Sequence, residues 1–195
     1  FLHYMDVHYP YYKPHAFRGR FLPFRGEPFY TNGLAPDMSA EDLEYSRACY
    51  DEGVAYQDEV LRDLFDRLQR SGILNDALVV VVSDHGDEFL EHGGLGHGTT
   101  CYEELIRSFI LFSHPRLEAR THDLPVSLVD VVPTLLEWAG APSPKDSDGR
   151  SLWPLLSRGD DSSLRKHRML FSELGDKKAL VDGSLKHIYN FGKKT

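Results

Sequence analysis

Residues 77–83 read Ala-Leu-Val-Val-Val-Val-Ser, and Asp84, His85 and Gly86 follow them directly. A run of β-branched residues without alternation is typical of a strand that is buried on both faces of a parallel sheet. In open α/β sheets, ligands bind at the carboxyl ends of the parallel strands. The sequence therefore predicts a functional site at Asp84 and His85, where this strand ends.

A long amphipathic helix is predicted directly before this strand. Residues 39–42 resemble a capping box, apolar residues recur at helical spacing over residues 43–68, and Gly72 suits the position after the last turn. A second helix is predicted from Asp130, as its N-cap, through Trp138. Because a helix followed by a buried strand indicates βαβ architecture, we expect an α/β fold with a mainly parallel sheet flanked by helices.

The two ends of the chain are predicted to differ from this α/β part. Residues 1–6 read as a buried strand, and since residue 1 is not an initiator methionine, we expect the chain to be part of a longer protein. Residues 7–37 hold five prolines, which forbid long regular elements. Three short strands are predicted near residues 169–174, 178–182 and 185–190. We therefore assign residues 1–160 to the α/β domain and residues 161–195 to the start of a small antiparallel subdomain.

Composition narrows the classes of function. The chain has 195 residues, with 22 Lys and Arg against 30 Asp and Glu, so its formal net charge is −8. This balance argues against nucleic acid as a partner, which would require a basic face. No apolar stretch approaches the ~20 residues of a membrane-spanning helix, so no transmembrane segment is expected. The two cysteines, Cys49 and Cys101, are too few for a disulfide framework.

Acidic and imidazole side chains gather after the valine-rich strand. Three histidines (His85, His92 and His97) and four acidic residues (Asp84, Asp87, Glu88 and Glu91) lie within this short segment. A carboxylate oxygen beside an imidazole nitrogen at a strand end favours a divalent cation site. The alternative is a plain turn, in which the aspartate accepts backbone hydrogen bonds and the histidine is merely exposed. The spacing alone leaves both interpretations open.

Several motifs along the chain resemble those of the sulfatase family, which belongs to the alkaline phosphatase superfamily. The opening motif, Asp-Val-His-Tyr-Pro-Tyr at residues 6–11, is similar to the family's Asp-Pro-His-x-Pro-Tyr, with valine replacing the first proline. The motifs that follow it stand in the family's order at residues 83–86, 91–93, 96–98, 102–104, 126–136 and 148–152. Because the order is kept over most of the chain, the resemblance is specific, and it implies an alkaline-phosphatase-like fold.

The resemblance also implies roles for four residues. Asp84 and His85 would be two ligands of a single divalent cation, with Ca²⁺ as the expected ion and Mn²⁺ or Zn²⁺ as alternatives. His8 and His97 would be catalytic and substrate-binding residues, which flank the sulfate or phosphate group and neutralise its oxygens or protonate the leaving oxygen. The implied reaction is metal-dependent hydrolysis of an anionic sulfate ester, carried by a small molecule or a glycan.

The family's nucleophile is not found in this sequence. Family members carry it in the N-terminal half, as a Cys or Ser that becomes formylglycine, and neither Cys49 nor Cys101 lies in the matching motif. We expect formylglycine only in a preceding part of the protein, and we expect this chain alone to be inactive on sulfate esters. Two alternatives stay open: a phosphoryl-group hydrolase or phosphoethanolamine transferase of the same superfamily, and a non-catalytic folded fragment that binds no metal.

Overall fold

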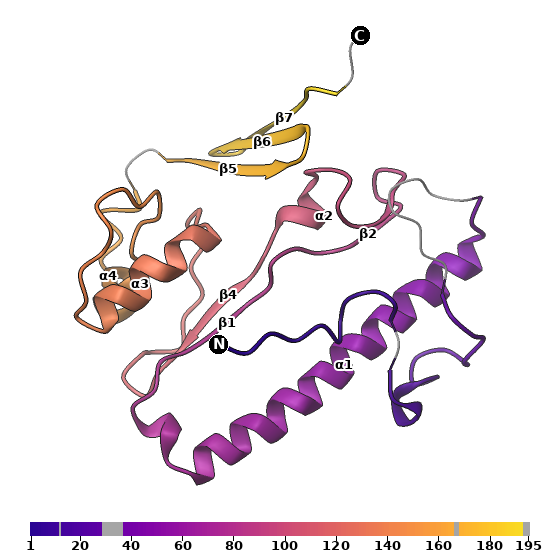
Figure 1. The fold of residues 1–195 in the computed structure, drawn as a ribbon, viewed down its shortest axis with the longest axis horizontal. Helices are drawn as coiled ribbons and strands as arrows, with labels where there is room; N and C mark the ends of the chain where they lie inside the picture. Colours follow the sequence, from indigo (N-terminus) through magenta and orange to yellow (C-terminus); the bar gives the residue numbers. More distant parts are fainter. Residues whose placement is uncertain (12, 29–36, 166–167, 193–195) are drawn as a thin grey trace. The chain divides into compact units, whose positions relative to one another are not determined.

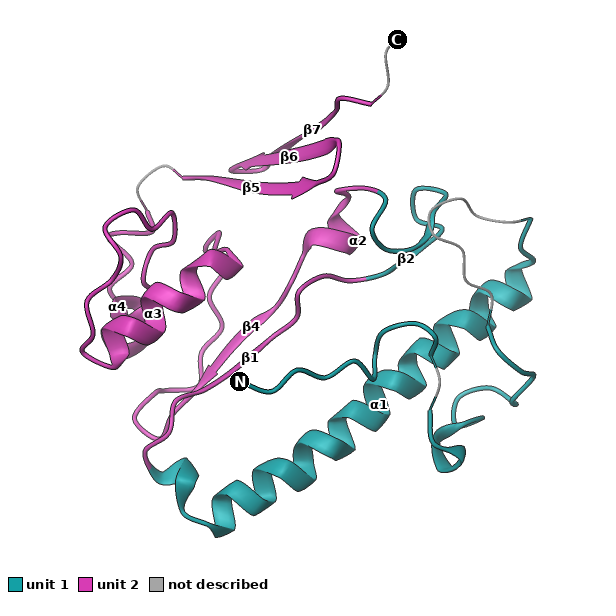
Figure 2. Ribbon diagram, in the orientation of Figure 1, with its two compact units in different colours: residues 1–75, 87–99 teal, residues 76–86, 100–195 magenta. Residues whose placement is uncertain are grey.

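The computed structural model describes residues 1–11, 13–28, 37–165 and 168–192. The predicted connection over residues 7–37 therefore lies partly outside the described residues, at residue 12 and at residues 29–36. The chain forms two compact units, coloured separately in Figure 2. Unit 1 comprises residues 1–75 and 87–99, and unit 2 comprises residues 76–86 and 100–195. The predicted boundary at residue 160 stays a prediction.

Unit 1 is built on the long predicted helix. Its elements, in chain order, are η1 (His15–Phe17), α1 (Ala40–Arg70), η2 (Ile73–Asn75), β2 (Glu88–Phe89) and β3 (Leu95–Gly96). Figure 1 shows α1 as one continuous helix. The Ser39 hydroxyl accepts a hydrogen bond from the Asp42 amide at 3.1 Å, and Gly72 follows the helix with φ of +77°. Both predicted ends of the helix are confirmed. Among the described residues, none of the helices combines the length and apolar character needed to cross a membrane.

The core of unit 1 lies where α1 meets the short β2–β3 hairpin. Tyr45 and Cys49 of α1 pack with Phe89 and Leu95 of the hairpin and with Tyr11 of the early loop. The hairpin is antiparallel, with Phe89 opposite Leu95. These contacts bring the loop that follows β2 and the loop around Tyr11 into one cluster.

Unit 2 contains all the longer strands. Its elements, in chain order, are β1 (Val79–Val82), α2 (Glu103–Ile106), β4 (Ile110–Ser113), η3 (Leu128–Asp130), α3 (Val131–Trp138), α4 (Trp153–Arg158), β5 (Met169–Leu174), β6 (Lys177–Asp182) and β7 (Leu185–Asn190). β1 pairs with β4 in an antiparallel two-stranded ribbon. β5, β6 and β7 form an antiparallel sheet in that order, which confirms the small antiparallel sheet predicted from the sequence.

Two predictions about strands need correction. β1 forms where predicted, but it is half-buried, and Val82 is 42% exposed. Among the described residues β1 pairs only with β4, and these residues do not enclose it on both faces. Residues 1–6 form no strand, because no described strand pairs with them, and Phe1 is fully exposed. All pairings between described strands are antiparallel, so the mainly parallel sheet stays a prediction.

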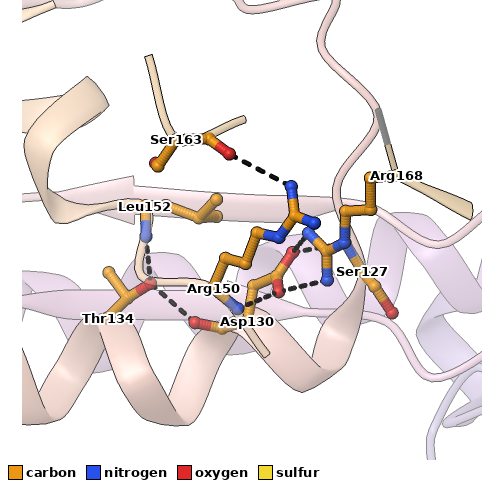
Figure 3. A network of polar contacts seen from close by, with 7 residues as sticks. All are labelled: Ser127, Asp130, Thr134, Arg150, Leu152, Ser163 and Arg168. Carbon is orange, nitrogen blue, oxygen red and sulfur yellow. Dashed lines mark hydrogen bonds and ion pairs between the residues drawn. The ribbon is translucent and has the colours of Figure 1, made fainter. Parts of the chain in front are cut away.

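Asp130 precedes α3, as predicted, but its side chain does not cap that helix. The carboxylate is fully buried and accepts hydrogen bonds from the backbone amides of Ser127 and Arg150, each at 2.8 Å (Figure 3). It also accepts two hydrogen bonds from the guanidinium of Arg168. The Thr134 hydroxyl donates to the Asp130 carbonyl and accepts from the Leu152 amide. This network joins α3 to the segments before α4 and before β5.

Candidate functional site

The end of β1 is held by backbone contacts at the start of β4. The Ser83 amide donates to the Phe109 carbonyl at 3.2 Å, and the Ser108 hydroxyl donates to the Asp84 carbonyl at 2.9 Å. These bonds fix the backbone at the predicted metal ligands. The Asp84 side chain itself is 80% exposed and that of His85 is 37% exposed, so both remain accessible to an ion in unit 2.

The geometry of Asp84 and His85 suits two ligands of one cation. The His85 Nδ1 lies 2.9 Å from the carbonyl oxygen of Gly86, which can only accept, so the ring hydrogen is on Nδ1. The other ring nitrogen, Nε2, lies 3.7 Å from Asp84 Oδ2. Two ligand atoms that share an ion at about 2.0–2.6 Å each stand roughly 3–4 Å apart. A carbonyl partner on the other nitrogen is also typical of a metal-ligating histidine.

One local contact of the same residues also agrees with the turn interpretation, so both interpretations stay open. Asp84 Oδ1 accepts a hydrogen bond from the His85 amide at 3.0 Å, which is a local side-chain-to-backbone contact. The next residue, Gly86, is closely approached by α2. Its amide donates to the Leu105 carbonyl at 3.0 Å, and a Cβ on Gly86 would lie 2.2 Å from the Glu104 carbonyl oxygen. Glycine is therefore required here because of the neighbouring backbone.

His8 and His97 come together within unit 1. Their ring centroids are 4.8 Å apart with an edge-to-face angle of 67°. His8 Nδ1 contacts the carbonyl oxygen of Tyr9, and His97 Nδ1 lies 2.5 Å from Asp87 Oδ1. In each ring Nδ1 faces an oxygen acceptor, so Nε2 can also donate to an oxygen of an anion when the ring is protonated on both nitrogens.

The sequence did not single out two further residues of this cluster. Asp87 is one of the four acidic residues of the segment after β1, and Tyr11 belongs to the opening motif, but neither pattern predicts a role for the individual residue. In the structure the Tyr11 hydroxyl donates to Asp87 Oδ2 at 2.7 Å, while the other Asp87 oxygen contacts His97. The spacing of these residues along the chain follows no period, so no sequence signal could have paired them.

Glu88 shapes the loop between β2 and β3, which precedes His97. Its side chain is 1% exposed, and Oε1 accepts hydrogen bonds from the amides of His92 at 2.9 Å and Gly94 at 2.7 Å. A buried carboxylate that gathers backbone amides is a common way to fix a tight loop. Glu88 therefore serves the shape of this loop.

The two cysteines are packed inside their units. Cys49 on α1 is 5% exposed and Cys101 is fully buried. Burial raises the pKa of both thiols, which makes thiolate formation unfavourable. Both positions agree with the sequence interpretation that neither cysteine is the nucleophile.

Known proteins match the chain in both sequence and structure. Arylsulfatase K of Danio rerio is 33% identical over 138 residues, which cover 70% of this chain and 26% of that protein. Choline-sulfatase of Rhizobium meliloti (strain 1021) is 33% identical over 124 residues, covering 62% and 24%. The chain thus spans about a quarter of the length of these curated relatives.

A solved structure and a family model extend the comparison. The phosphonate monoester hydrolase from Silicibacter pomeroyi superposes with a TM-score of 0.69 at 23% identity, over 80% of this chain and 35% of that one. This likeness supports an α/β fold of the alkaline-phosphatase type. The family model described as Sulfatase matches residues 1–141, a range that includes the paired histidines of unit 1 and the Asp84–His85 pair of unit 2. The chain therefore belongs to the sulfatase family.

Proposed function

We propose that this chain is part of a metal-dependent enzyme that hydrolyses sulfate esters. Membership of the sulfatase family supports this reaction class, and the names of the relatives, an arylsulfatase and a choline-sulfatase, support an anionic sulfate ester as substrate. The ester is carried by a small molecule or a glycan.

The observation that carries the proposal is the pairing of His8 with His97. His8 of the opening loop and His97, which directly follows β3, meet with their rings 4.8 Å apart. Two imidazoles that each direct Nδ1 at an oxygen acceptor can, in the imidazolium form, donate Nε2–H to a sulfate oxygen. As the attacking group bonds to sulfur, the sulfur–oxygen bond of the ester breaks and its electron pair stays on the leaving oxygen. That oxygen takes a proton from Nε2 of His97 in its imidazolium form, which leaves the neutral ring with its hydrogen on Nδ1.

Asp84 and His85 are proposed to hold the divalent cation, with Ca²⁺ expected and Mn²⁺ or Zn²⁺ as alternatives. When bound, such an ion polarises the ester oxygens and offsets negative charge in the transition state. The 3.7 Å separation of Asp84 Oδ2 and His85 Nε2 supports this assignment. The attacking group is a formylglycine that the family resemblance locates outside this sequence, so the chain alone is expected to be inactive on an aryl sulfate.

Calorimetric titration with CaCl₂, MnCl₂ and ZnCl₂ tests the metal assignment. The wild-type chain is compared with Asp84→Ala, and Asp146→Ala is the matched control because Asp146 is an exposed aspartate in the polar connection of the same unit. We expect the heat of binding to vanish in Asp84→Ala and to persist in Asp146→Ala. Equal binding by all three proteins would refute the role of Asp84 and would leave the turn interpretation of this residue.

A second candidate is hydrolysis or transfer of a phosphoryl or phosphonate group. The observation in its favour is the mixed oxygen and nitrogen ligand pair, because a borderline ion such as Mn²⁺ or Zn²⁺ suits an Asp–His pair better than an all-oxygen site. A clear preference for Mn²⁺ or Zn²⁺ over Ca²⁺ in the titration, together with phosphate binding stronger than sulfate binding, would favour this candidate.

A further inference from the structure

A chain of three polar side chains runs through unit 1 toward the proposed anion site. The Tyr11 hydroxyl donates to Asp87 Oδ2 at 2.7 Å, and Asp87 Oδ1 lies 2.5 Å from His97 Nδ1. The side chain of Asp87 is 6% exposed and that of His97 is 17% exposed. We propose that Asp87, held by Tyr11, is a positioning residue that fixes the imidazole of His97 as the tautomer with its hydrogen on Nδ1.

The contact between Asp87 and His97 defines the tautomer. A carboxylate oxygen accepts hydrogen bonds, so a ring nitrogen at 2.5 Å from it is the one that carries the hydrogen. A carboxylate that is almost entirely buried also requires donors, since a buried unpaired charge is strongly unfavourable. Among the described residues, the hydrogen bonds that reach Asp87 come from Tyr11 and His97, one on each oxygen.

Tyr11 is itself held rigidly by the core of unit 1. It is 6% exposed, its ring stacks on Phe89 at 6.3 Å between centroids, and the ring of Tyr50 meets it edge to face at 5.6 Å. The hydroxyl position is therefore set by packing on α1 and β2. Because this hydroxyl anchors one carboxylate oxygen, the other oxygen has a fixed direction toward the imidazole.

The consequence for the site is the choice of ring nitrogen. With Nδ1–H directed to Asp87, the nitrogen that His97 presents to an ester is Nε2. An acidic partner that orients a histidine in this way is a recurring device in hydrolytic sites, where loss of the carboxylate allows the wrong tautomer. The catalytic meaning of this arrangement rests on the function proposed above, whereas the tautomer itself does not.

Long-range nitrogen NMR of the chain labelled with ¹⁵N-histidine tests the proposal directly. At about pH 9, where an ordinary imidazole is neutral, we expect His97 to carry its hydrogen on Nδ1, with the signal assigned by its loss in His97→Gln. Asp87→Asn offers an amide that can donate to Nδ1, so the hydrogen should move to Nε2. Asp87→Glu keeps a carboxylate and should restore the Nδ1–H form.

His114 in unit 2 provides an internal control in the same spectrum. Its Nδ1 accepts a hydrogen bond from the Arg116 amide at 3.1 Å, so its hydrogen is on Nε2. This signal should be unchanged in every Asp87 variant, because His114 lies in unit 2 and has a different Nδ1 partner. A wild-type His97 with its hydrogen on Nε2, or an Asp87→Asn variant that keeps Nδ1–H, would overturn the proposal.

Addition of inorganic sulfate tests the anion site at His8 and His97 independently of the positioning role of Asp87. Sulfate that shifts the Nε2 signals of His8 and His97 supports the anion site. If sulfate leaves both signals unmoved while the His97 tautomer still responds to Asp87→Asn, the anion site fails and the positioning role of Asp87 stands.

Discussion

The carboxylate of Asp130 accepts two hydrogen bonds from the guanidinium of Arg168, at 2.7 Å to Nη1 and 2.6 Å to Nη2. Both side chains are buried: that of Asp130 is fully buried, and that of Arg168 is 7% exposed. A bidentate pair of this kind has a fixed geometry. It ties the segment that leads into β5 to the start of α3, as Figure 3 shows.

Replacing Arg168 with methionine should destabilise unit 2 by about 3–5 kcal/mol, because a buried carboxylate then loses its cationic partner. Both tryptophans, Trp138 and Trp153, lie in unit 2, so urea unfolding followed by their fluorescence measures this loss. The control is Arg165→Met, which removes an exposed pair with Asp161 and should change the free energy by less than ~1 kcal/mol. Equal effects of the two substitutions would show that Arg168 is not a structural partner.

Gly53 and Lys13 are predicted to be coupled in unit 1. Lys13 is 2% exposed, and a Cβ on Gly53 would lie 2.6 Å from Lys13 Cε. In an open helix, Gly→Ala stabilises by roughly 1 kcal/mol, but here the added methyl must displace a buried side chain. We expect Gly53→Ala to destabilise the wild-type chain and to stabilise the Lys13→Ala variant. Thermal unfolding followed by the helical circular dichroism signal measures both, and an identical effect in the two backgrounds would contradict the coupling.

The stability of unit 1 should rise with alkaline pH because of Lys13. Burial lowers its pKa below the ordinary 10.5, and the nearby Asp6 opposes this shift only partly. Between the lowered folded pKa and 10.5, the unfolded chain binds more protons than the folded one, so the free energy of unfolding increases with pH across that window. Below the window both states are protonated, and the folded state carries the full unfavourable effect of a buried charge.

Lys13→Met provides the comparison, because the other titrating groups of the chain then act equally in both proteins. We subtract the unfolding free energy of Lys13→Met from that of the wild type. This difference should increase as the pH rises toward 10.5. Lys145 is an exposed lysine and serves as the control. The difference in unfolding free energy between the wild type and Lys145→Met should not change with pH. A difference that falls with pH would mean that Lys13 is stabilised as a cation.

Both thiols should react slowly with a disulfide reagent such as Ellman's reagent. Cys49 and Cys101 are at most 5% exposed, and burial raises the pKa of each, so little thiolate is present and access is blocked. Single variants, Cys49→Ser and Cys101→Ser, assign the rates. Each rate should increase strongly in denaturing urea, whereas a native rate equal to that of a free thiol would disprove the burial.

The local features of the fold were predictable from the sequence. α1 begins at its capping box and ends before Gly72, and β5, β6 and β7 form where apolar runs alternate with turn residues. These elements depend on interactions between residues close in the chain. The candidate ligands Asp84 and His85 were also visible, because they directly follow a valine run.

Features that depend on distant partners were not predictable. Residues 1–6 have the composition of a strand, but a strand forms only where another one supplies its hydrogen bonds. The half-exposed state of β1 depends in the same way on which elements cover it. Asp87 and Tyr11 meet through the packing of the early loop on α1 and β2, which no local pattern in the sequence encodes.

The β1–β4 ribbon also has a consequence for handling the protein. Among the described residues these two strands pair only with each other, so each has an outer edge with amide and carbonyl groups that face no strand. Val82 and Leu111 on the ribbon are 42% and 51% exposed. Edges of this kind act as templates for a second molecule. We therefore expect the chain to associate through these edges at high concentration, and a charge introduced by Leu111→Lys to reduce this association.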